Sequence, residues 1–467
     1  MQNAEGEWIW NPSKGYNAWV DTLPEEECVW LTILDADQQL NISRRPDSFG
    51  QFPWNVDDWD EVEQWVRQPQ VQEAVENFQD SAGRPHMGYA LQTDIGPEVH
   101  EAYKRHNPTG MWEWEPRSNL PENPPEGDLI YHYVSASSVV VNAQVASVLV
   151  GAMNEETDAV VSGVTSVISF RALMDDQSAM AQLMYCSNVK KASLALLSVL
   201  EETPEFLSDA QLQELDDLYA SLMDSGVLLF EVDAERLKFA DTVRRCLNRR
   251  GKFDAKRAVK FLDAAANHGS FDVKDPSPVS LEFSKLAPGV QSTLQLSTDV
   301  LRIMHEESKI PWAGNNELES IISTGDTLVS GILESNFIEF MIPGYQRVAS
   351  VSRETQQRVM ATRLVIAIHR HQLRHDVFPE SIEKIDADLL GFDPIDAFTG
   401  ELLGFYLMED TPIVYSVGSD LDDDDGAYLW AFGDAPQWVI PEEVGQRKAD
   451  GSWDLDGDWL LFPVIGH

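Results

Sequence analysis

Apolar residues recur at helical spacing through the middle of this chain. Between residue 131 and about residue 266, runs such as Val160, Val164 and Val167 repeat every three or four positions. Turn and N-cap signals separate these runs, among them residues 154–158 and residues 207–211. Because short connections between consecutive helices favour antiparallel neighbours, the pattern predicts a helical bundle or a stack of helical hairpins.

The pattern changes towards the C-terminus. Residues 316–340 predict a helix that ends at Pro343-Gly344, and an apolar stripe at Ala361, Leu364 and Ile368 predicts a second, long helix to residue 375. Three apolar runs of strand period follow, at residues 402–407, 413–417 and 459–462. The expected fold class is therefore mainly α with a C-terminal α+β module, in which the long helix packs on a small antiparallel sheet.

The first 130 residues have a different texture, with nine of the fourteen tryptophans and frequent prolines. Only residues 57–78 predict a clear helix there. The tryptophans favour packing in a small core, but exposed rings such as Trp112 and Trp114 would suit a carbohydrate-binding or carbohydrate-active protein. Three regions are expected: a Trp-rich mixed region over 1–130, a helical domain over 131–345 and the α+β module over 346–467.

Composition narrows the function classes. The chain of 467 residues has length for two or three domains, and its formal net charge of −44 is spread along it. The electrostatic field of this negative charge repels nucleic-acid phosphates and anionic lipid headgroups, so neither is an expected partner. A saline or extracytoplasmic setting suits it. Its three cysteines lie far apart, which predicts separate buried thiols, with no disulfide framework or thiolate zinc site.

Membrane signals are weak in this sequence. Residues 1–6 lack a basic segment followed by an apolar run, so no signal peptide is predicted at this start. The longest apolar stretch, residues 135–153, is interrupted by Asn142 and Gln144 and is rich in small residues. It therefore predicts a buried helix and no membrane span in the chain.

An acidic run between Asp420 and Asp425 contains five carboxylates. They repel one another unless solvent or a cation compensates them, and oxygen-rich loops suit a hard cation such as calcium. Taken by itself, the run favours a solvated hairpin loop over a calcium site.

Three segments resemble the periplasmic part of the major pseudopilin of type II secretion systems. Residues 378–382 (Phe-Pro-Glu-Ser-Ile) are similar to the Tyr-Pro-x-x-Leu turn that ends the family's helix, and Asp393-Pro394 to the segment that starts its sheet. Residues 417–420 (Val-Gly-Ser-Asp) are similar to its calcium-binding Leu-Gly-Ala-Asp loop. Unlike the pseudopilin helix, the helix here follows some 340 residues and carries Arg353, Arg358 and Arg363.

The resemblance implies a calcium site. Asp420 is the best single ligand by position, Asp422 and Asp424 alternate on one side, and Asp458 stands where the family's closing strand begins. Val417 offers a main-chain carbonyl. These five residues form the expected ligand set.

The rest of the chain resembles large uncharacterised bacterial proteins that join such a module to a helical domain and usually start with a membrane anchor. The similarity lies in residues 82–85 (Ala-Gly-Arg-Pro), 170–173 (Phe-Arg-Ala-Leu) and 208–212 (Ser-Asp-Ala-Gln-Leu). Together, these features predict a non-enzymatic, extracytoplasmic interaction or structural protein with protein partners.

Enzyme-like residue clusters are sparse. His371 and His375 are four apart and share a helix face, but no Glu stands between them as in a metalloprotease. We expect them, with His369, to form a polar face near the helix C-terminus. The pairs Glu201-Glu202 and Asp216-Asp217 have the residue types of a glycosidase, but their predicted helix-surface positions disfavour that role.

Overall fold

The computed structural model describes residues 17–46, 49–50, 52, 59–90, 132–175, 179–229, 336–418, 421, 423, 446–447, 453–454 and 458–464. Its helices are η1 (Glu25–Glu27), α2 (Trp30–Ile42), α3 (Trp59–Val66), α4 (Pro69–Ser81), α6 (His132–Met153), α7 (Thr157–Ser169), η4 (Arg171–Met174), α8 (Ala179–Glu202), α9 (Asp209–Asp224), α16 (Asn336–His375) and η6 (Ile382–Lys384). Its strands are β1 (Gly404–Met408), β2 (Thr411–Ser416), β3 (Gln446–Arg447), β4 (Trp453–Asp454) and β5 (Trp459–Phe462). The predicted fold class, mainly α with a C-terminal α+β module, is confirmed.

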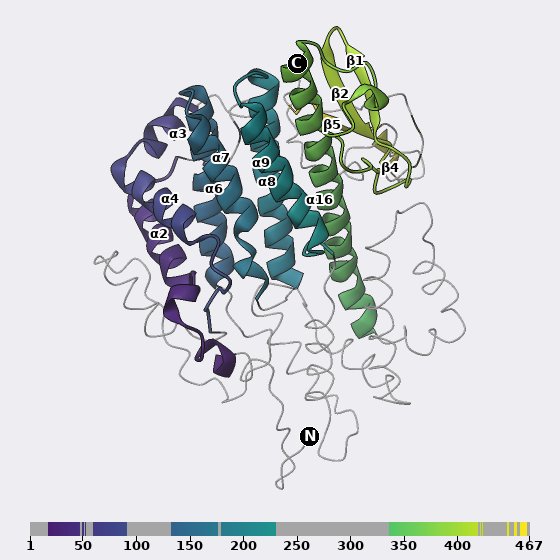
Figure 1. The fold of residues 1–467 in the computed structure, drawn as a ribbon. Coiled ribbons are helices and arrows are strands. Elements are labelled where there is room, and N and C mark those ends of the chain that lie inside the picture. The colour runs from purple at the N-terminus through teal and green to yellow at the C-terminus, as the bar shows by residue number, and fades with distance from the viewer. Residues whose placement is uncertain are drawn as a thin grey trace.

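Helix α6 lies at the centre of the helical layer. It packs against α2, α3 and α4 on one side and against α7 and α8 on the other. Figure 1 shows the long helices side by side from α2 to α16, with the sheet beyond α16. By length and composition, one helix of the described part can span a membrane, Tyr133–Met153 with a mean hydropathy of 1.6, and 67% of that window is buried inside the protein. Such burial is typical of the core helix of a bundle.

Helices α6 and α7 approach each other closely at Gly163. A Cβ atom added there would lie 2.4 Å from Val148 Cγ2 and 2.7 Å from Gln144 Nε2. The missing side chain therefore allows the α6–α7 hairpin to close.

The N-terminal helices differ from the sequence prediction. The prediction of a single helix over 57–78 is wrong. The helix is interrupted at Gln68, whose backbone is extended, and α4 begins at Pro69, a residue type favoured in the first turn of a helix. Helix α2 was not predicted, since its buried face includes Asp37 and Gln38 as well as apolar residues. The expected core packing is confirmed for three tryptophans, Trp30, Trp59 and Trp65, which are at most 7% exposed.

Helix α16 connects the bundle to the sheet. It continues through Pro343 and Gly344, so the prediction that these residues separate two helices is wrong. Packing of the following turns against α8 and α9 outweighs the one backbone hydrogen bond that a proline removes. The opposite side of α16 contacts β2 and β5, where Arg358 Nη1 donates a hydrogen bond to the Leu461 carbonyl at 2.7 Å.

The C-terminal sheet has the strand order β1-β2-β5 and is antiparallel throughout. All three strands fall on the segments predicted from apolar alternation. Its last β2–β5 pair joins Ser416 to Trp459. Strands β3 and β4 form a separate two-stranded ribbon.

Candidate functional site

The sheet brings two of the predicted calcium ligands to one place. Beyond the Ser416–Trp459 pair, the antiparallel register places Val417, which follows β2, opposite Asp458, which precedes β5. Asp458 is buried, with 5% of its surface exposed. Asp420, Asp422 and Asp424 lie outside the described residues, so their predicted role stays a prediction.

A second buried carboxylate, Asp396, occupies the same end of the sheet and was missed by the sequence analysis. Its Oδ2 accepts a hydrogen bond from the Val417 amide at 3.2 Å, and its Oδ1 accepts one from the Phe398 amide at 2.7 Å. Burial raises the pKa of Asp396, although hydrogen bonds from Ser416 and from these amides oppose the shift. Asp396 therefore fixes the backbone where the acidic loop begins.

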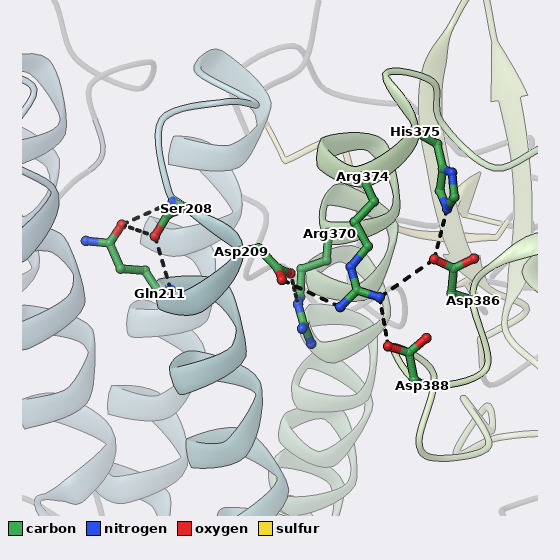
Figure 2. Close-up of polar contacts among 8 residues, drawn as sticks. All are labelled: Ser208, Asp209, Gln211, Arg370, Arg374, His375, Asp386 and Asp388. Atoms are coloured by element: carbon green, nitrogen blue, oxygen red, sulfur yellow. Dashed lines mark hydrogen bonds and ion pairs between the residues drawn. The ribbon is translucent and has the colours of Figure 1, made fainter.

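Helix α9 begins beside the C-terminal end of α16. Ser208 and Gln211 form a capping box at this start, with the Gln211 amide donating to Ser208 Oγ at 3.3 Å. The next residue, Asp209, accepts a hydrogen bond from Arg370 Nε at 2.6 Å and lies 3.5 Å from Arg374 Nη2 (Figure 2). The hydrogen bond from Arg370 lowers the pKa of the Asp209 carboxyl. An acid at a helix start and bases at a helix end also complement the two helix dipoles.

Arg374 extends this network to the segment that follows α16. Its Nη1 donates to Asp388 Oδ2 at 2.7 Å and lies 3.8 Å from Asp386 Oδ2. Figure 2 shows Arg374 between these two carboxylates and Asp209. The hydrogen bond with Asp388 raises the pKa of Arg374 and lowers that of Asp388. Arg374 thus links the start of α9, the end of α16 and the turn at Asp386.

His371, His375 and Asp386 form a compact cluster at the same turn. One ligand atom of each lies within 4.8 Å of the others. His375 Nε2 is 2.9 Å from Asp386 Oδ2, and His371 Nδ1 is 3.7 Å from Asp386 Oδ1. The spacing of the two histidines was visible in the sequence, whereas Asp386 carried no signal that linked it to them.

The expected polar face of three histidines is wrong for His369. This residue is 1% exposed, and burial lowers its pKa to about 4, so it is neutral at physiological pH. Its ring lies between Phe378 and Phe462, with centroid distances of 5.5 and 5.9 Å. Because α16 is rotated so that His371 and His375 point towards the turn at Asp386, His369 points into the core.

The acids considered as glycosidase candidates make structural contacts. Glu201 Oε2 accepts a hydrogen bond from the Val464 amide at 2.7 Å, and Asp216 Oδ1 accepts one from Arg363 Nε at 2.8 Å. Trp112 and Trp114, on which the carbohydrate alternative depends, lie outside the described residues.

Comparison with protein-family models, with curated proteins and with solved structures finds no match to this chain.

Proposed function

We propose that this protein is a non-enzymatic, extracytoplasmic interaction or structural protein whose pseudopilin-like C-terminal module is stabilised by calcium and serves secretion or surface assembly. The observation that carries the proposal is the register of β2 and β5. It brings the backbone positions of Val417 and the buried Asp458 together, at the two ends of the segment that contains the acidic run. Calcium binds mixtures of carboxylate and main-chain oxygens, which is what these two positions offer.

Further carboxylates at this end of the sheet support a cation requirement. Asp396 is 1% exposed and bonded to the Val417 amide, and the Tyr415 hydroxyl donates to Asp423 Oδ1 at 3.3 Å. Crowded carboxylates in a partly buried place repel one another. A dication bound in the loop would relieve that repulsion and fix the loop backbone.

The rest of the module suits a rigid surface for a protein partner. Helix α16 is held on one side by the Arg363–Asp216 ion pair and on the other by the hydrogen bond from Arg358 to Leu461. Strand β1, which pairs only with β2 among the described strands, exposes 51% of Met408, and the preceding Leu402 is 47% exposed. An edge strand with exposed apolar side chains can receive a partner chain.

Calcium binding is tested by thermal melting of the full chain with chelator and then with millimolar calcium or magnesium. The full chain is needed because an isolated 346–467 module would expose the face of α16 that packs on α8 and α9. We expect calcium to stabilise the protein by about 2.7 kcal/mol at a hundredfold excess over Kd. Magnesium should act weakly, because its strict octahedron suits a flexible loop poorly.

Three variants make the test specific. Asp420→Ala and Asp458→Asn should remove the calcium-dependent rise in Tm. Asp410→Asn should keep it, because Asp410 directly precedes β2 and so lies at the opposite end of that strand from Val417. If calcium and magnesium raised the Tm of the parent protein equally, or if calcium raised the Tm of Asp420→Ala as much as that of the parent, the acidic run would be a solvated loop without a calcium site.

A further inference from the structure

We propose that His371, His375 and Asp386 form a binding site for a divalent transition metal of the zinc class, separate from the calcium loop. Among the described residues, this is the one group of three or more His, Cys, Asp or Glu side chains whose ligand atoms come this close. Two imidazole nitrogens and one carboxylate oxygen are the donors that zinc takes in open, three-ligand sites.

The distances fit such a site. Ligand bonds of about 2.0–2.1 Å in a tetrahedron place neighbouring ligand atoms about 3.3–3.4 Å apart. The His375 Nε2–Asp386 Oδ2 distance, 2.9 Å, and the His371 Nδ1–Asp386 Oδ1 distance, 3.7 Å, lie on either side of this value. One ligand atom of each residue lies within 4.8 Å of the others. Small rotations of the partly exposed His375 and Asp386 side chains therefore suffice to bring the three donors into position.

His371 supplies the second, independent observation. Only 8% of its surface is exposed, and its Nδ1, directed at Asp386, has no hydrogen-bond partner. A buried polar nitrogen without a partner costs free energy, which a metal bond would recover.

The third ligand is held firmly, and the site is open on one side. Asp386 stands between the buried residues Ile385 and Leu389, and its carbonyl accepts the Leu389 amide at 2.8 Å. The His375 side chain is 46% exposed and that of Asp386 is 31% exposed, so a fourth position faces solvent. A bound metal would compete with Arg374 for Asp386, but Arg374 retains Asp388 and Asp209 as partners.

The proposal is tested by titrating chelator-treated, desalted full chain with zinc chloride in an isothermal titration calorimeter. Millimolar calcium in the buffer occupies hard-oxygen sites, so the result does not depend on the acidic loop. We expect one zinc ion per chain, and for cobalt(II) a visible absorption spectrum altered by nitrogen ligation. His375→Gln and Asp386→Asn should each weaken zinc binding by at least about tenfold.

His86→Gln is the matched control, because His86 lies 3.5 Å from Asp175 in a His–carboxylate pair without a second histidine. It should leave zinc affinity unchanged. His371→Gln should also weaken binding, but His371 is buried, so the more exposed His375 and Asp386 variants decide the test if it fails to fold. Absence of stoichiometric zinc binding by the parent would overturn the proposal. So would a zinc affinity of the His375 and Asp386 variants equal to that of the parent.

Discussion

Arg363 of α16 and Asp216 of α9 form a 2.8 Å ion pair between residues that are 147 positions apart in the sequence. Both side chains are mostly shielded, at 11% and 13% exposure, and the Arg363 guanidinium also lies 3.8 Å from the centroid of the Phe392 ring. This one arginine therefore joins the helical bundle to the segment that leads into the sheet.

Breaking this pair should destabilise the protein. Asp216→Asn leaves the Arg363 charge uncompensated in a shielded place, so we expect the free energy of unfolding to fall by about 2 kcal/mol. Glu63→Gln is the control, because it breaks the exposed pair between Glu63 of α3 and Arg67, the residue after that helix, and should change stability by less than about 0.5 kcal/mol. Denaturant unfolding measures both. Equal effects of the two substitutions would contradict a special role for Arg363.

The buried His369 should make stability depend on pH. Its pKa is about 4 in the folded protein, against 6.5 ordinarily, so between these values the unfolded chain binds a proton that the folded chain does not. Stability should therefore fall as pH decreases from about 6.5 to 4, by about 3 kcal/mol in total, and the loss should be complete below pH 4. His369→Phe should flatten this part of the pH profile relative to the parent. A parallel decline in both proteins would contradict the prediction.

Asp37 should change the pH dependence of stability in the opposite direction to His369, so that its effect favours the folded state as pH falls. This residue of α2 is 6% exposed, and burial raises its pKa to about 6 from 3.8. Its ionisation therefore penalises the folded state fully above pH 6, and the penalty disappears as pH falls to 3.8. Asp37→Asn should stabilise the protein by roughly 2 kcal/mol at pH 7.5 and by less at pH 5. Asp80→Asn, on the exposed side of α4, should change little at either pH. A gain that does not shrink with acidity would exclude this explanation.

Gly404 should not tolerate a side chain. It pairs with Tyr415 across β1 and β2, and a Cβ atom added to it would lie 2.1 Å from Tyr415 Cζ. Gly404→Ala should therefore displace the ring and destabilise the protein by about 2 kcal/mol. Gly391→Ala is the matched control, since nothing lies within 4 Å of the added Cβ. Thermal melting of both variants checks the difference, and equal melting temperatures would show that the ring moves freely.

The sequence by itself determined the elements whose signals are local. The spacing of Val160, Val164 and Val167 predicted α7, the Ser208–Gln211 pattern predicted the start of α9, and apolar alternation predicted β1, β2 and β5. Each signal depends on residues within a few positions of one another, where helix and strand periods are fixed by backbone geometry.

Only the tertiary structure decided which faces and charges meet. It buried His369 while leaving His375 half exposed, brought Asp386 to the two histidines, and paired Arg363 with a distant aspartate. It also carried α16 through Pro343 and Gly344. The physical reason is that packing of a long helix against α8, α9 and the sheet sets its rotation and its length. These contacts join residues far apart in the chain, so no local pattern encodes them.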